Sequence, residues 1–290
     1  MSRESRTRLR GRQRGFALLL VLWGLILLGL IAASFLRETR VSTTLARNIV
    51  ENAKAEALAD AGIQRAILGL LDSDPATAWR ADSRLYRFAL GEGAVDIQIH
   101  DERGKIDLNH APAEILVALF QATGSDPEAA HRLADAILDY ADRDGNRRPA
   151  GAEDSDYTDT GLKEGAKDAP FDRKEELMNV LGMTRTIYDA VASSVTVYSG
   201  QSDVNTTTAP ELVLRTIPDL TAKQFDEIMS ARSGRVPSQL SRVDVVTIIA
   251  DATTSGGGRF VREVVARRSG EPGDPFHLLE WRQTWQSASP

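Results

Sequence analysis

The pattern of apolar positions changes twice near the start of the chain. Residues 16–36 include no charged side chain, and at about 1.5 Å per residue a helix of this length spans roughly 30 Å, the thickness of a bilayer core. After Leu36, apolar residues recur at helical spacing as far as Leu71, with charged residues between them. We therefore expect a single helix of about 55 residues, of which 16–36 crosses a membrane and 37–74 lies outside it. Two helices that meet near Arg37 are the alternative.

Alternation of apolar and polar residues predicts strands in two parts of the chain that are far apart in sequence. Gly93–His100 alternates and is followed by a turn sequence, after which 105–109 is a possible second strand. Arg259–Arg267 and Phe276–Arg282 flank a turn rich in glycine and proline, which is typical of an antiparallel strand pair. We expect these strands to form one antiparallel sheet domain, built from residues 75–108 and 250–290.

Helical patterns fill most of the chain between those two parts. Pro112 and Pro127 each mark the first turn of a helix. Asn109 is followed seven residues later by a leucine, and Asn205 repeats this spacing at the start of a second helix pair. Both pairs resemble helix-hairpin-helix units. The predicted fold is therefore α+β, with a long N-terminal helix, an antiparallel sheet and a large helical insertion at 109–249.

The charge distribution separates a basic start from an acidic body. Six arginines and one glutamate precede Gly15 and contribute a charge of +5, so the rest of the chain must carry −11 to give the net charge of −6. By the positive-inside rule the arginines stay in the cytoplasm and the body is exported. An acidic body argues against binding of duplex nucleic acid, which needs a basic face. The chain has no cysteine, so it has neither a disulfide nor a zinc site built on thiolates.

The position of Gly15 indicates how the amino terminus is processed. A secretory signal peptide carries its small-residue cleavage site after the apolar run, whereas this glycine stands before it. Cleavage after Gly15 would remove a basic leader, residues 1–15, and leave Phe16 at the start of an intact hydrophobic helix. From this run alone, a plain single-pass anchor and an uncleaved signal anchor are the alternatives.

Carboxylates crowd the loop that follows the second predicted helix of the insertion. Asp142, Asp144 and Asn146 stand at the first, third and fifth positions of a calcium loop, and Glu153 stands at the twelfth. Arg147 occupies the place of the glycine expected at position six, so an ordinary EF-hand is not indicated. We expect a calcium loop of another kind, with a solvated acidic loop as the alternative. Three further acids complete this site or form a second one: Asp154, Asp156 and Asp159.

No pattern in the sequence favours catalysis. It contains no glycine loop that would hold a phosphate and no nucleophile elbow. The acids after the second helix stand at the spacing of metal ligands, which does not favour a pair of catalytic carboxylates. We therefore expect a protein without enzyme activity.

Several short motifs, spread over nearly the whole chain, resemble the minor pseudopilin K family of type II secretion systems. The first is the junction of Gly15 with Phe16 and the apolar segment after it. At the fifth position after the junction most pseudopilins carry glutamate, and this chain carries Leu20, as is characteristic of the K subunit. The others are Leu108-Asn109, Gly151-Ala152-Glu153-Asp154, Pro170-Phe171 with Glu175-Glu176-Leu177, and Val195-Thr196-Val197-Tyr198-Ser199 followed by Val204-Asn205.

This resemblance implies a structural role in an assembly. It implies that prepilin peptidase cleaves after Gly15 and methylates the new amino terminus at Phe16. It implies a pseudopilin sheet domain with a helical insertion and bound calcium nearby. The partners it implies are the minor pseudopilins I and J, in a complex at the tip of the pseudopilus. The location it implies is the inner membrane, crossed once, with a cytoplasmic amino terminus and a periplasmic main domain.

Leu20 suits a position at the tip on physical grounds. In a filament, a buried glutamate can pair with the amino terminus of a neighbouring subunit, because each charge is unfavourable alone in lipid. A subunit with leucine at this position needs no such neighbour. Two other classes remain open from the sequence: a minor pilin of a related type IV filament, and a membrane-anchored DNA-binding protein that uses the helix-hairpin-helix units.

Overall fold

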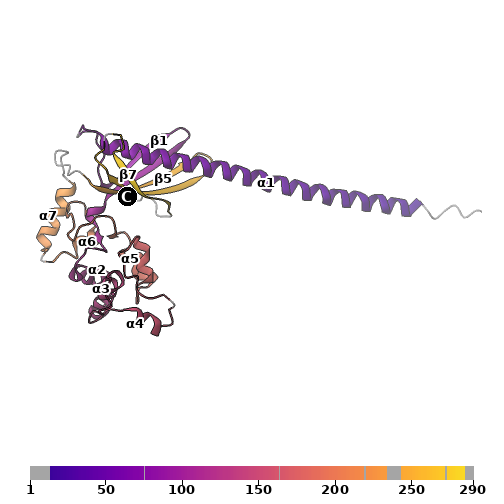
Figure 1. Ribbon diagram of the computed structural model, residues 1–290. Coiled ribbons are helices and arrows are strands. Elements are labelled where there is room, and N and C mark those ends of the chain that lie inside the picture. The colour runs from indigo at the N-terminus through magenta and orange to yellow at the C-terminus, as the bar shows by residue number, and fades with distance from the viewer. Residues whose placement is uncertain are drawn as a thin grey trace, which may run out of the picture.

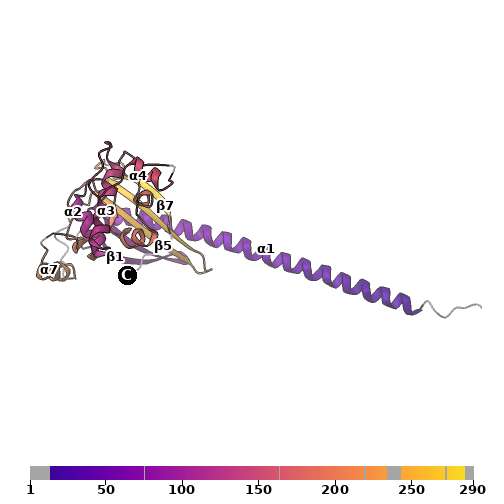
Figure 2. The same ribbon diagram turned by 90° about the horizontal axis from the view of Figure 1, so that it is seen from below.

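The computed structural model describes residues 14–74, 76–162, 164–218, 220–233, 243–271 and 273–284, except the side chains of residues 14, 15, 17 and 35–41. Residues 1–13 of the predicted leader and the last residues of the sheet domain, 285–290, lie outside this description. Figure 1 shows one long helix, α1 (Arg14–Leu71), which projects far beyond a body made of a sheet and short helices. Figures 1 and 2 place the sheet between the end of α1 and these helices, so the fold is α+β.

The carboxyl-terminal part of α1 packs on one face of the sheet through small and branched side chains. Ala59, Ile63 and Ala66 recur every three or four residues and are fully buried. Gly62 lies between them, and a Cβ atom there would come within 2.8 Å of Val95 Cγ1. Small side chains at these positions therefore set how closely the helix approaches the sheet.

Five antiparallel strands form the sheet in the order β1-β2-β5-β6-β7. Their bounds are Asp82–Leu90 for β1, Gly93–Asp101 for β2, Val245–Thr254 for β5, Arg259–Arg268 for β6 and Phe276–Gln283 for β7. The strands expected at β2, β6 and β7 are present, and β6 pairs with β7 as predicted. The sequence did not predict β1. It is an edge strand with no fully buried residue and a register shift between Asp82 and Leu85, so its alternation is weak.

The carboxyl-terminal boundary of the helical insertion differs from the sequence prediction. The predicted insertion extends to residue 249, whereas β5 begins at Val245. Val246 and Ile248 belong to the core beneath α1, while Thr247 donates a hydrogen bond to Glu102 on the other side of the sheet. A strand that is buried on both faces reads as a continuous apolar run, and periodicity alone does not distinguish it from a helix.

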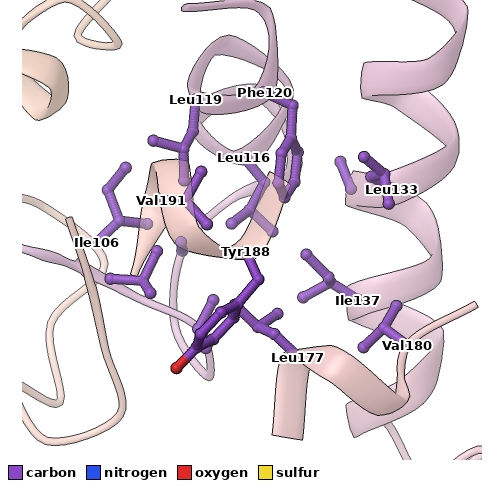
Figure 3. Close-up of a cluster of buried hydrophobic side chains, with 14 of the residues drawn as sticks. Ile106, Leu116, Leu119, Phe120, Leu133, Ile137, Leu177, Val180, Tyr188 and Val191 are labelled. Atoms are coloured by element: carbon purple, nitrogen blue, oxygen red, sulfur yellow. The ribbon is translucent and has the colours of Figure 1, made fainter. Parts of the chain in front are cut away.

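The helical insertion has a hydrophobic core of its own. Figure 3 shows Leu116 and Phe120 facing Leu133 and Ile137, with Tyr188 beside them. The possible strand expected at 105–109 is present as β3 (Ile106–Asp107), which pairs in parallel with β4 (Val195–Thr196), and this pair ties the two ends of the core together. The helices are α2 (Ala113–Ala122), α3 (Pro127–Ala141), α4 (Asp154–Asp159), α5 (Arg185–Val191), α6 (Glu211–Leu214) and α7 (Ala222–Ser233), and the 3-10 turns are η1 (Glu102–Gly104) and η2 (Lys174–Asn179).

Candidate metal site and domain junction

The acidic loop lies between the end of α3 and the start of α4. Asp142 caps α3, and its N–H donates to the carbonyl oxygen of Leu138 at 3.0 Å. Glu153 caps α4, and its N–H donates to Asp156 Oδ2 at 2.9 Å. The ends of two helices thus position two of the predicted ligands, Asp142 and Glu153. The two lie close enough that the charge of Asp142 raises the pKa of the Glu153 carboxyl group.

One arginine organises the acids at the end of α3. Asp139 is fully buried, and its carboxylate accepts hydrogen bonds from Arg148 Nη1 at 2.7 Å and from the Arg148 N–H at 3.1 Å. The same Nη1 donates to Asp142 Oδ2 at 2.5 Å. Gly151 lies against this carboxylate, and a Cβ atom there would fall 1.9 Å from Asp139 Oδ2, so a side chain would displace it. Asp139 and Arg148 are site residues that the sequence did not single out.

Two buried carboxylate oxygens at this loop have no hydrogen-bond partner in the described part of the chain: Asp142 Oδ1 and Glu153 Oε1. Glu153 is only 9% exposed. Its burial raises the pKa of its carboxyl group, and four nearby charges add to this effect: Asp139, Asp142, Asp168 and Asp144. A buried carboxylate without a partner is unfavourable. Carboxylate oxygens are the ligands that calcium prefers, so the donors present here fit such an ion.

Three predicted ligands lie on the outer side of the loop. Asp144 and Asn146 are exposed, and Asp144 Oδ1 accepts a hydrogen bond from the Asn146 N–H at 2.9 Å. Asp159, the last residue of α4, is also exposed. Among the described residues, no three histidine, cysteine, aspartate or glutamate side chains already lie together as a metal site. Binding of an ion would therefore have to draw these carboxylates closer.

The remaining two predicted ligands have protein partners. Asp154 Oδ1 accepts a hydrogen bond from the Ala166 N–H at 3.0 Å. Asp156 uses one oxygen for the N–H of Glu153 and the other for Arg147 Nη1, at 2.9 Å each. These two acids therefore hold the loop to its surroundings, and protein groups already use part of the hydrogen-bonding capacity of their carboxylates.

The predicted processing residues lie on the projecting part of α1. Gly15 is the second residue of the helix, Phe16 is 67% exposed and Leu20 is 59% exposed. The body of the protein does not cover this part of the helix (Figure 1). Within the described residues, no helix has both the length and the apolar character needed to cross a membrane.

A buried ionic cluster joins the sheet to the helical insertion at Glu102. This side chain is 2% exposed and accepts hydrogen bonds from Lys105 Nζ at 2.5 Å and Thr247 Oγ1 at 2.7 Å, and a third from the Thr196 hydroxyl. Burial opposes the charged form, yet the charge of Lys105 and the three hydrogen bonds hold the pKa of Glu102 below its usual range. Because Thr247 is in the sheet and Thr196 in β4, one carboxylate connects both parts.

A second ion pair crosses the same junction. Arg282 of β7 donates to Glu263 of β6 at 2.7 Å and to Glu175 of η2 at 2.6 Å. Asn109 ties two further segments, since its amide donates to the Phe171 carbonyl oxygen at 3.0 Å and accepts from the Phe171 N–H at 2.7 Å. Motifs that are far apart in sequence are therefore in contact within the folded insertion.

Comparisons with known proteins agree with this organisation. Residues 97–200 match the family model described as type II secretion system (T2SS), protein K. The type II secretion system protein K of Klebsiella pneumoniae is 28% identical over 201 residues, a match that covers 61% of this chain and 60% of that relative's length. The fold resembles a chain in the crystal structure of the GspK-GspI-GspJ complex from the enterotoxigenic Escherichia coli type 2 secretion system, with a TM-score of 0.58 at 19% identity. That superposition covers 86% of this chain and 100% of the other.

The matched region contains several of the motifs on which the sequence resemblance depended, whereas the Gly15–Phe16 junction, Leu20 and Val204-Asn205 lie outside it. It begins in β2, includes Asn109 and the acidic loop, and ends just after β4. The buried carboxylates of Glu102 and Asp139 also lie within it. The resemblance to the protein K family of type II secretion systems found in the sequence is confirmed by the match over residues 97–200 and by the similarity to the Klebsiella pneumoniae protein.

Proposed function

We propose that this chain is a non-enzymatic minor pseudopilin at the tip of a type II secretion pseudopilus, where it caps or initiates the filament and supports protein export. The observation that carries this proposal is the protein K match over residues 97–200. The projecting part of α1 supports it, because a helix with exposed apolar side chains outside its own domain needs other partners to cover them.

The partners we propose are the minor pseudopilins I and J. The support is the likeness in fold to a chain whose crystal structure is that of a GspK-GspI-GspJ complex. The acidic body of this chain adds no argument for a nucleic-acid partner, since binding to the phosphate backbone depends on lysine and arginine.

The location we propose is the inner membrane, with the main domain in the periplasm and the amino terminus in the cytoplasm. This rests on the sequence of residues 16–36, some of which lie outside the described side chains, and on the arginines before Gly15. Prepilin peptidase would cleave after Gly15 and methylate Phe16. Leu20 would then place the subunit where no charged neighbour is required.

The cofactor we propose is a structural calcium ion in the acidic loop. Asp142 and Glu153 would hold it, because each has a buried carboxylate oxygen that no described residue satisfies. Calcium would supply charge neutralisation and a link between α3 and α4. Arg148 would keep Asp142 oriented by holding its other oxygen.

Complementation of secretion tests the proposed function. In the organism that carries this gene, deletion should abolish export of the substrates of its type II system, and the full chain should restore it. A Gly15→Val variant is a useful control, because it should keep the leader by mass spectrometry and fail to restore export. Undiminished export in the deletion strain would contradict the proposal.

A further inference from the structure

The helical insertion and the sheet have separate hydrophobic cores. Among the described residues, none of the core around Leu116 and Ile137 belongs to the core beneath α1. Units of one chain that are joined largely by hydrogen bonds and ion pairs are expected to move relative to each other. We propose that the insertion is an arm that turns on the sheet, and that polar contacts at the edge strand β7 form a clamp that keeps it closed. This inference does not depend on the proposed role at the tip.

The two connections between the sheet and the insertion lie side by side. β2 leads into the insertion through η1, and the chain returns to the sheet at β5, which is the neighbour of β2. Hydrogen bonds hold the insertion here, since Asp101 Oδ2 accepts from Asn205 Nδ2 and from Thr208 Oγ1, at 3.1 Å each. Glu102 adds the buried cluster described above. This side of the junction is therefore the pivot of the arm.

The clamp lies at the edge of the sheet. β6 separates β7 from β5, so β7 stands two strand spacings, roughly 10 Å, from the pivot. Arg282 of β7 donates to Glu175 of η2 at 2.6 Å, and the Tyr198 hydroxyl, just after β4, donates to Glu280 Oε2 at 3.0 Å. A longer contact joins Arg267 Nη2 to the carbonyl oxygen of Tyr198 at 3.3 Å. All three cross from the sheet to the insertion, so a turn about the pivot would break them.

The composition of the clamp makes it reversible. The side chains of Arg282 and Glu175 are 25% and 44% exposed, so water and salt reach their ion pair. Two buried atoms of the clamp, Arg282 Nε and Glu263 Oε2, have no hydrogen-bond partner among the described residues. Each unmade hydrogen bond is unfavourable and offsets part of the stabilisation from the contacts that are made. A modest change in free energy is therefore enough to shift the balance between the closed and the open arm.

Spin labels can follow this movement, because the chain has no cysteine of its own. Leu68→Cys on α1 and Glu128→Cys on α3 replace two exposed side chains, one on each side of the pivot. Double electron–electron resonance of the doubly labelled full chain in detergent measures the distribution of the distance between the labels. In this parent chain we expect one narrow distance, that of the closed arm.

Removal of the clamp should populate a second distance. Glu175→Ala combined with Tyr198→Phe deletes the two shorter crossing contacts and leaves the side chains of the sheet unchanged. The share of molecules at the second distance should rise at least about fivefold. Glu211→Ala is the matched control, because Glu211 pairs with Arg215 on the insertion itself, and it should leave the distribution unchanged. The circular dichroism spectrum of each variant should match that of the parent chain, which shows that it is folded.

Salt provides a second measurement that needs no clamp variant. Raising sodium chloride from about 0.1 M to about 1 M shortens the Debye length from about 10 Å to about 3 Å. In the parent chain this should increase the share of the same second distance.

The remaining outcomes contradict the proposal. A single unchanged distance in the folded clamp variant would overturn the movable arm, and if that variant does not fold, an unchanged distance at high salt has the same meaning. An equal rise in Glu211→Ala would overturn the clamp, because the crossing contacts would then have no special part. Two comparable populations in the parent chain at low salt would also overturn it, since the arm would then move without being held.

Discussion

Replacing Glu102 with alanine is expected to lower the free energy of unfolding by about 3–5 kcal/mol, the usual result when one partner of a buried ion pair is removed. The carboxylate is 2% exposed and its partner Lys105 is 9% exposed, so water does not replace the lost contact. The hydroxyl groups of Thr196 and Thr247 would lose their acceptor at the same time. Chemical denaturation followed by circular dichroism measures the change.

Glu128 serves as the control for this substitution. Its side chain is 90% exposed, and the one ion pair it forms with a described residue, Arg132 at 3.7 Å, lies on the surface of α3. Glu128→Ala should therefore leave the unfolding midpoint unchanged within error. A loss below about 1 kcal/mol for Glu102→Ala would show that the cluster does not connect the sheet to the insertion.

Removal of calcium is expected to produce the other large effect. If the free ion is present at about a thousand times its Kd, binding stabilises the folded state by about 4 kcal/mol. For a chain of this size, that corresponds to a fall in melting temperature of roughly 10 °C when the ion is chelated. The physical reason is that Glu153 and Asp142 then keep unsatisfied oxygens among like charges.

Thermal unfolding with a chelator, and then with calcium added back in excess, measures this shift. Magnesium at the same concentration is the control, because it prefers a small octahedral site and keeps its water molecules. The melting temperature should return with calcium and not with magnesium. A melting temperature that does not respond to either step would refute the calcium loop.

Local patterns predicted those elements whose two faces differ in environment. Helices α2 and α3 are examples, since their buried positions recur at helical spacing, while β6 and β7 were located by the glycine- and proline-rich turn between them. Val246 and Ile248 in β5 gave no such contrast, because both faces of that strand are covered. Along β1 no residue is fully buried, so the contrast was too weak to detect.

The candidate metal site and the Glu102 cluster were predictable only in part, because sequence patterns do not show contacts between separate segments. Ligand spacing predicted Asp142 and Glu153 as ligands, and each has a buried carboxylate oxygen without a partner among the described residues. Arg148 was not identified as part of the site, although it lies in the same loop, because sequence gives no sign that it contacts Asp139. Glu102 depends on Thr247, which is far away in the chain and becomes its neighbour only through the pairing of β2 with β5. Spacing along one segment cannot reveal such contacts.

Co-purification of the full chain with the pseudopilins I and J of its own secretion system tests the proposed role most directly. The three proteins would be co-expressed with prepilin peptidase, extracted in detergent, and captured through a tag on this chain. Native mass spectrometry should then detect one complex that contains all three, with this chain beginning at Phe16. Recovery of this chain alone, while I and J are present and folded in the same extract, would contradict a place for it in the tip complex.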